Sequence, residues 1–247
     1  MPGAGTVAVA SLRVRRTRPA GQFSQDDVRQ TGAMPIVLLV RHGQASFGAD
    51  DYDRLSDRGR EQAEATGRWL AARGLRRPVA VHGTLRRQRD TAGLALAAAG
   101  SDVEPRVDGR WDEYDHIDLV RRYAAAQGGE QPRTSREFQV VLDAALVAWV
   151  EHGDDGGWPA FTAAVTGAVH DLVASLESGQ DAVVFTSAGV IAAVCADLLG
   201  TGAAGLVAFN RVAVNGAVTK LAAGRTGLAL LTFNEHSHVD GENLTYR

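Results

Sequence analysis

Two segments of the sequence combine residue types that can handle phosphate. Arg41-His42 directly follows an apolar run, and the segment Gly83–Ala92 carries three arginines, Arg87 among them. A neutral imidazole is a competent nucleophile toward phosphorus, and the planar fork of an arginine matches phosphate oxygens. The start of a helix also attracts anions, because its backbone N–H groups and its dipole point at the ligand. We therefore expect a phosphate-handling site centred on Arg41 and His42.

Each segment also has a simpler structural explanation. His42 alone could be a strand-end histidine that only packs against its neighbours. The cluster of Arg86, Arg87 and Arg89 could face solvent, and we expect this for two of the three because a helical turn points them apart. The two segments are informative together, since both open where a predicted strand ends.

The elements that must position these residues are short strands alternating with helices. Apolar, β-rich runs predict strands at 36–40, 79–81, 103–107, 182–186, 217–222 and 228–233. Helices are predicted from a Ser56 cap to Arg73 with Gly74 as the stop, and over 85–98 and 188–199. In such α/β sheets, ligands gather at the carboxyl ends of the strands, which is where His42 lies.

The chain divides into a leader and one α/β domain. Residues 1–33 are basic and aperiodic, which predicts a disordered leader and a native start at Met34, with the domain over 34–247. Residues 118–177 are expected to be wholly helical and to form a cap beside the sheet, anchored by Trp149, Trp158 and Phe161.

Composition excludes several classes of protein. The chain has 247 residues and a formal net charge of -3, which gives no indication of nucleic-acid binding. Cys195 is the single cysteine, so no internal disulfide forms, and no apolar run reaches the roughly 20 residues that span a bilayer. We expect a cytoplasmic protein without a membrane partner, and the sequence leaves its oligomeric state open.

Four ordered segments resemble the histidine phosphatase superfamily, which includes the phosphoglycerate mutases. The resemblance runs from about residue 35 to the end of the chain. The segments are Arg41-His42-Gly43 followed by Gln44; Leu55-Ser56-x-x-Gly59-x-x-Gln62-Ala63; Leu85-x-Arg87-x-x-x-Thr91-Ala92; and Glu113 within Trp111–Tyr114.

The resemblance implies a three-layer α/β/α sandwich with a mostly parallel central sheet. It also implies metal-independent hydrolysis or transfer of phosphate from small phosphomonoesters, with no cofactor. In that scheme His42 attacks phosphorus to give a phosphohistidine, while Arg41 and Arg87 hold the phosphate oxygens. Glu113 protonates the leaving oxygen and then helps to activate water, and Gln44 contributes to phosphate binding.

The sequence departs from the family pattern at two positions. Ser187 stands where the family places a second histidine that donates to the phosphoryl group, and Gly48 stands where many members have asparagine. Ser187 could still donate one hydrogen bond, and it could equally cap the helix that follows. His82 or His116 could supply the missing donor, although a surface or packing role is the more common one for each.

Two further patterns are interpreted as structural. Gly200–Gly205 matches the Gly-x-Gly-x-x-Gly motif of dinucleotide-binding loops. That motif should follow a strand and open a helix, whereas this segment follows a predicted helix and no helix clearly starts from it. Asp50, Asp51 and Asp53 could form a hard-metal site, but acids in a glycine-containing loop are usually solvated, so no metal is expected.

Three functions remain open at this stage. A phosphatase ranks first, because nucleophile, arginines and acid are all present. A pseudoenzyme that binds phosphorylated ligands without turnover is supported by Ser187. A phosphoglycerate-type mutase ranks third, because the chain stops at Arg247, soon after the last predicted strand, where mutases tend to have a C-terminal lid.

Overall fold

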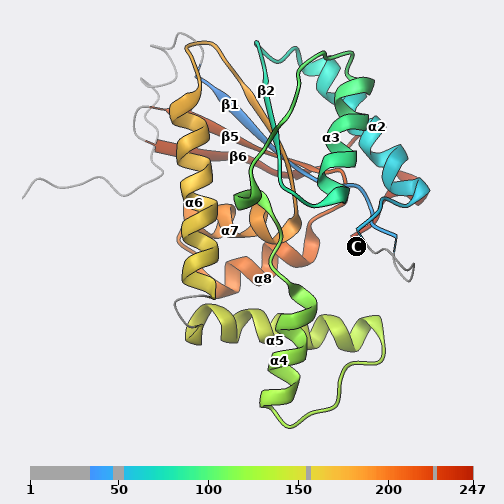
Figure 1. Ribbon diagram of the computed structural model, residues 1–247, viewed down its shortest axis with the longest axis vertical. Helices are drawn as coiled ribbons and strands as arrows, with labels where there is room; N and C mark the ends of the chain where they lie inside the picture. The colour runs from blue at the N-terminus through green and yellow to red at the C-terminus, as the bar shows by residue number, and fades with distance from the viewer. Residues whose placement is uncertain (1–33, 47–52, 154–156, 225–226, 247) are drawn as a thin grey trace, which may run out of the picture.

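A six-stranded mixed sheet forms the centre of the protein (Figure 1). The computed structural model describes residues 34–46, 53–153, 157–224 and 227–246, so the predicted leader, Gly48, Asp50 and Asp51 lie outside the described residues. The strands run in the order β3-β2-β4-β1-β5-β6. They are β1 (Ile36–Arg41), β2 (Val79–His82), β3 (Arg106–Val107), β4 (Ala182–Thr186), β5 (Val218–Gly224) and β6 (Gly227–Glu235). The first four strands are parallel to one another, and the two later pairings are antiparallel.

Helices α2 (Asp57–Arg73) and α3 (Arg86–Ala98) cover one face of this sheet. Alternate residues of β1, Leu38 and Val40, face these helices because successive side chains of a strand point to opposite sides. Helix α2 begins at a Ser56 cap, whose hydroxyl accepts from the Gly59 amide, and it ends at Gly74, as predicted.

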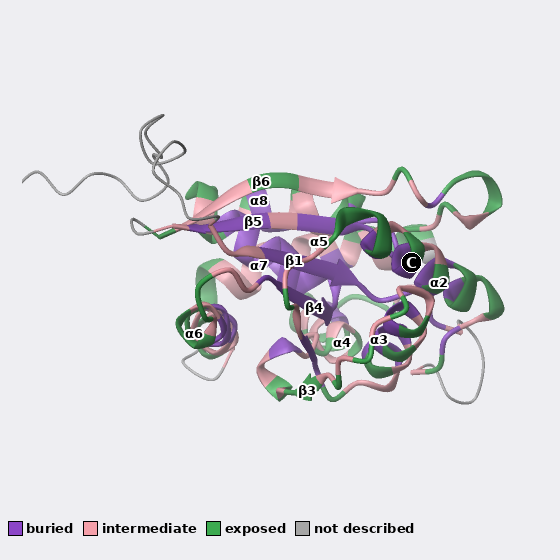
Figure 2. Cartoon of the chain, turned by 90° about the horizontal axis from the view of Figure 1, so that it is seen from above, coloured by how far each residue is buried: buried purple, intermediate pink, exposed green. Residues whose placement is uncertain are grey.

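Helices α6 (Trp158–Ser175) and α7 (Ala188–Leu199) cover the opposite face. Figure 2 shows α6 and the α2–α3 pair on either side of the stacked strands. Val37 and Leu39 of β1 pack here, together with Val169 of α6 and Val190 of α7. These two covered faces confirm the expected α/β/α layers with a mostly parallel sheet.

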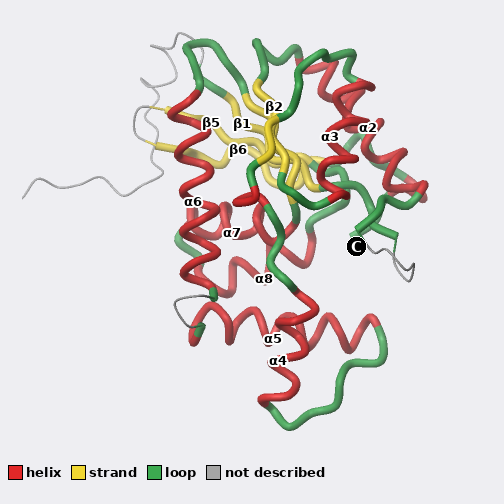
Figure 3. Tube along the Cα trace, viewed as in Figure 1, coloured by secondary structure: helices red, strands yellow, loops and turns green. Residues whose placement is uncertain are grey.

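A small helical cap lies at one end of the molecule. It consists of α4 (His116–Ala126) and α5 (Ser135–His152), which pack on α7 and α8 (Gly202–Val212). Figure 3 shows the two cap helices beyond the strands. The predicted anchors Trp149, Trp158 and Phe161 meet in one aromatic cluster, in which the rings of Trp149 and Trp158 are 5.2 Å apart.

The structure corrects three details of the predicted elements. The helical stretch 118–177 is interrupted, and its last helix, α6, covers the sheet instead of joining the cap. Strand β3 has only two residues. A helix does start within Gly200–Gly205, since α8 begins at Gly202; Leu206 of this helix is fully buried against α7. In each case, packing against distant elements decides what the local pattern leaves open. None of the helices in the described ranges is long and apolar enough to cross a membrane.

Candidate active site

The ends of three neighbouring parallel strands bring the predicted site residues together. His42 follows β1, and its backbone amide donates to the Thr186 carbonyl at the end of β4, 2.9 Å away. Strand β2 ends on the other side of β4, and α3, which follows it, carries Arg87 on the same face of the sheet as His42. Arg41, His42 and Arg87 are all buried.

The imidazole of His42 is held in one tautomer. Its Nδ1 lies 2.7 Å from the Gly43 carbonyl oxygen, which only accepts hydrogen bonds, so Nδ1 carries the proton. The Nε2 lone pair is then turned toward Arg87, whose Nε–H donates to it at 3.2 Å. Burial lowers the pKa of His42 well below its usual value, and the positive charges of Arg87, Arg41 and His116 lower it further. His42 is therefore a neutral imidazole at neutral pH, with its Nε2 lone pair directed at Arg87.

Arg87 is oriented by a carboxylate as well as by the histidine. Its Nη1 donates to Asp53 Oδ1 at 2.6 Å, and the second oxygen of Asp53 accepts from the Arg86 amide at 2.7 Å. An anion thus lies at the start of α3, where the sequence predicts anion binding. The expectation that Asp53 is only solvated was wrong, because its carboxylate forms an ion pair with a buried arginine.

Arg41 approaches the site from the other face of the sheet. The strand alternation places its side chain on the α7 side, where its Nη1 donates to the carbonyl oxygens of Ala213 and, at 2.9 Å, Tyr246. Its guanidinium is still close enough to lower the pKa of both His42 and Glu113 through its charge. Arg41 and Arg87 therefore approach His42 from different elements.

Glu113 is held at the start of α7. Its Oε2 accepts from the Gly189 amide at 3.0 Å, and its Oε1 accepts from the Tyr114 amide at 3.2 Å. Burial raises the pKa of Glu113, and this outweighs the opposing effect of the Gly189 amide and of the arginines. The absence of a side chain at Gly189 leaves room for this carboxyl, because a Cβ atom at this position would lie 2.2 Å from Glu113 Oε1. The charges of Arg87 and Arg41 act on both Glu113 and His42, so the carboxyl lies near the same two arginines as the imidazole.

Ser187 lies between β4 and α7, at the position predicted from the sequence. It is fully buried, and its hydroxyl accepts from Gln88 Nε2 at 2.9 Å. The same amide group donates to the Trp111 carbonyl at 3.0 Å, which ties α3 to the segment that leads to Glu113. Ser187 occupies the N-cap position of α7, but its side chain makes no capping hydrogen bond, so the capping role expected for it was wrong.

The loop after His42 packs directly on the start of α2. A Cβ atom on Gly43 would lie 2.1 Å from the Gly59 carbonyl oxygen, and a Cβ atom on Gly59 would lie 2.1 Å from the Gln44 carbonyl oxygen. The close contact between these two backbone segments therefore needs glycine at both positions. The Gln44 side-chain oxygen accepts from the Ser56 hydroxyl at 3.0 Å. The Gln44 side chain is thus directed toward Ser56, at the start of α2, and its predicted phosphate contact stays a prediction.

The two histidines considered as substitute donors differ in position. His82 is buried at the end of β2, and its Nδ1 lies beside the Gly83 carbonyl oxygen, the same arrangement that His42 shows. His116 begins cap helix α4, stands edge-on to Phe138, and acts electrostatically on His42.

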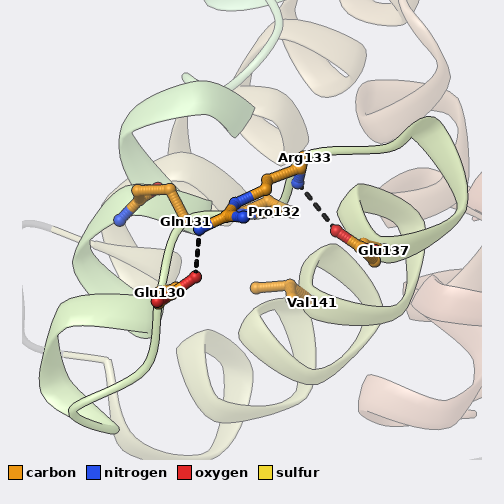
Figure 4. A pocket seen from close by; sticks show the side chains of 6 residues that line it. All are labelled: Glu130, Gln131, Pro132, Arg133, Glu137 and Val141. Carbon is orange, nitrogen blue, oxygen red and sulfur yellow. Dashed lines mark hydrogen bonds and ion pairs between the residues drawn. The ribbon is translucent and has the colours of Figure 1, made fainter.

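Two other features lie outside this cluster. A hollow in the loop between α4 and α5 is lined by Glu130–Arg133, Glu137 and Val141 (Figure 4). Arg133 bridges it, because its guanidinium donates to Glu130 and its backbone amide donates to Glu137. Within the described ranges, no group of three or more His, Cys, Asp or Glu side chains could hold a metal ion.

Sequence reasoning missed a set of polar residues that hold the His42 loop from behind. Asn215 Nδ2 donates to the His42 carbonyl at 3.1 Å, and Gln62 Oε1 accepts from the Gln44 amide at 2.8 Å. Both side chains are fully buried, and both contact Thr245. Gln62 belongs to a recognised motif, but nothing local to Asn215 or Thr245 in the sequence indicates a partner more than 170 residues away.

Comparison with known proteins agrees with this geometry. Residues 37–236 match the model of the Histidine phosphatase superfamily (branch 1). A 2,3-bisphosphoglycerate-dependent phosphoglycerate mutase of Thermobifida fusca is 35% identical over 112 residues, which span 42% of this chain and 42% of that protein.

Solved structures of similar fold include phosphatases and mutases. Mycobacterial hydrolase 1 has a TM-score of 0.62 at 25% identity and covers 83% of this chain and 100% of its own. A mycobacterial glucosyl-3-phosphoglycerate phosphatase in complex with VO3 has a TM-score of 0.59 at 27% identity and covers 82% of this chain and all (100%) of its own. A phosphoglycerate mutase from Bacillus anthracis shares the fold with a TM-score of 0.59 at 17% identity, over 83% of this chain and 96% of its own. The chain belongs to the histidine phosphatase superfamily.

Proposed function

We propose that this protein is a metal-independent phosphatase that hydrolyses small phosphomonoesters through a phosphohistidine on His42. One observation carries the proposal: the buried His42 imidazole has its proton on Nδ1, and its Nε2 lone pair faces the guanidinium of Arg87. This arrangement presents a nucleophile and a phosphate-binding cation at the same point. Phosphoryl transfer needs mainly positioning and charge stabilisation, which these two groups supply.

The proposed reaction proceeds in two steps. In the first, His42 Nε2 forms a bond to phosphorus as the ester P–O bond breaks, and the proton of Glu113 passes to the leaving oxygen. In the second, the Glu113 carboxylate accepts a proton from water, the water oxygen attacks phosphorus, and the P–N bond breaks to release inorganic phosphate. The raised pKa of Glu113 supports its first role, since it keeps the carboxyl protonated to a higher pH than that of an ordinary glutamate.

Ser187 is proposed to replace the second histidine of the family. A neutral hydroxyl brings no charge, and this one already accepts a hydrogen bond from Gln88. Loss of one preorganised donor costs about 10²–10³ in rate. We therefore expect a slower enzyme than a member with both histidines.

Substrate and location follow from the same proposal. The ligand is a small phosphorylated molecule that enters beside the cap, and neither nucleic acid nor a membrane surface is needed as a partner. We propose a cytoplasmic location. Cys195 is fully buried, and burial raises the pKa of its thiol to about 12, so this cysteine is unreactive.

The decisive experiment measures hydrolysis of p-nitrophenyl phosphate with and without a chelator. The wild type is compared with His42→Ala, Ser187→His and, as a matched control, His152→Ala, which replaces an exposed histidine at the end of α5. Chelator-resistant turnover that is lost only in His42→Ala is the expected result. Undiminished activity of His42→Ala would end the proposal, and a phosphate ligand that binds but stays intact for hours would favour a binding pseudoenzyme.

A mutase is the second candidate, because the Thermobifida fusca relative carries that name. A mutase uses the same phosphohistidine but passes the phosphoryl group to a second hydroxyl instead of water. Incubation with a phosphorylated hydroxy acid separates the two: release of inorganic phosphate indicates the phosphatase, and an isomeric phosphoester without phosphate release indicates the mutase.

A further inference from the structure

The segment Asn243–Tyr246 lies against the back of the candidate active site. Figures 1 and 2 both place this end of the chain beside α2, close to the loop that follows β1. The Thr245 backbone carbonyl accepts from the Asn215 amide at 2.9 Å, and Gln62 Nε2 donates to the Asn243 carbonyl at 2.6 Å. The segment is thus fixed to two elements that also contact the His42 loop.

The Thr245 hydroxyl joins two buried amide side chains. It donates to Asn215 Oδ1 at 3.0 Å and accepts from Gln62 Nε2 at 2.8 Å. The opposite end of each amide contacts the main chain next to the nucleophile: Asn215 Nδ2 donates to the His42 carbonyl, and Gln62 Oε1 accepts from the Gln44 amide. The backbone on either side of Gly43 is therefore held by two amides that share one hydroxyl.

The chemistry of this arrangement requires a hydroxyl. An amide side chain has a donor end and an acceptor end, and rotation by 180° exchanges them. The threonine oxygen accepts from Gln62, which directs the Gln62 oxygen toward the Gln44 amide; its proton goes to Asn215, which directs the Asn215 NH₂ toward the His42 carbonyl. An apolar side chain at position 245 would make neither bond. Asn215 Oδ1 would lose the donor that orients this amide, whereas Gln62 Nε2 would keep the Asn243 carbonyl as an acceptor.

The same segment also reaches a phosphate-binding arginine. The carbonyl oxygen of Tyr246, the next residue, accepts from Arg41 Nη1 at 2.9 Å. Displacement of Thr245 would therefore move an acceptor of Arg41 as well as the two amides behind His42.

We propose that Thr245 is a positioning residue, which sets the orientation of Asn215 and Gln62 and through them the backbone that carries His42. The proposal rests on the proposed phosphatase function for its catalytic consequence. Thr245 contacts no reacting atom in this scheme. Its effect is on geometry, and a misplacement of about 1 Å at a reacting group costs on the order of 10²-fold in rate.

The test compares Thr245→Val, Thr245→Ala and Thr245→Ser with a matched control, Thr232→Val, which removes an exposed hydroxyl from β6. We expect kcat on p-nitrophenyl phosphate to fall about 10–100-fold in the valine and alanine variants, as for other residues that orient site groups. The serine variant keeps the hydroxyl and should stay close to the wild type, as should Thr232→Val. Both Thr245→Val and Thr245→Ala lack the hydroxyl, so the test can still be made if one of them fails to fold.

Hydrogen exchange at the Gln44 backbone amide gives a readout that does not require activity. Exchange at this amide should accelerate in Thr245→Val and return to the wild-type rate in Thr245→Ser. Wild-type kcat and wild-type exchange in both valine and alanine variants would overturn the proposal. An inactive wild type would contradict the phosphatase function alone, since the exchange data would still decide the role of Thr245.

Discussion

Replacing Gly189 by alanine tests whether Glu113 acts as the proton donor. The Gly189 amide donates to Glu113 Oε2, and a Cβ atom added at this position would lie 2.2 Å from Glu113 Oε1 and 2.2 Å from a ring carbon of Tyr114. Contacts of that length do not persist, so the Glu113 carboxyl must move by roughly 1 Å, a displacement that costs about 10²-fold in rate. The variant removes no functional group and changes only where the acid lies.

Gly189→Ala should change the free energy of unfolding only slightly compared with its effect on the reaction rate. Alanine is favoured over glycine in a helix by up to about 1 kcal/mol, while overpacking against Tyr114 costs about 1–3 kcal/mol. A matched control is Gly93→Ala in α3, where an added Cβ meets nothing within 4 Å. The control should keep full activity and gain a little stability.

The assay compares two substrates that differ in their need for an acid. An alkyl phosphate has a poor leaving group and requires protonation, whereas p-nitrophenolate leaves without much help. We expect Gly189→Ala to lose about 10²-fold in kcat on the alkyl phosphate and much less on p-nitrophenyl phosphate. Equal losses on both substrates, or no loss on either, would refute the assignment of Glu113 as the donor.

Two further predictions concern pH. The first step needs neutral His42 and protonated Glu113. The lowered pKa of His42 and the raised pKa of Glu113 widen the pH range in which both forms are present. We therefore expect kcat/KM to rise with pH through the pKa of His42 and to fall through the pKa of Glu113, and Glu113→Gln should abolish the alkaline fall. Burial alone would raise the pKa of Asp181. The hydrogen bonds that Asp181 accepts from Arg76 and from the Ile36 amide outweigh this effect and hold the pKa below its ordinary value. Asp181→Asn should therefore lower the free energy of unfolding at pH 7 by about 2–4 kcal/mol, a range reduced because the Arg76 side chain is 33% exposed. In urea unfolding, the difference in free energy between wild type and variant should shrink as the pH falls through the lowered pKa of Asp181. A difference that stays constant down to pH 2 would contradict the role of the ionised carboxylate.

The sequence alone determined the elements whose signals are local. A continuous apolar run defines each buried parallel strand, and Ser56 and Gly74 bound α2 as expected, because caps depend on residues within one turn. The placement of His42 and Arg87 in one site also follows from local information. Each lies just after a parallel strand, and the carboxyl ends of such strands meet at one edge of the sheet.

Only the tertiary structure decided which polar groups support the nucleophile. Asn215 and Thr245 lie in loops after α8 and β6, and their hydrogen-bonding partners are set by backbone paths that no short-range pattern records. The same holds for Ser187, whose hydroxyl meets Gln88 of α3 instead of the helix that it precedes. A hydroxyl or an amide bonds with whatever the fold brings within about 3 Å, so its role becomes visible only once the chain has folded.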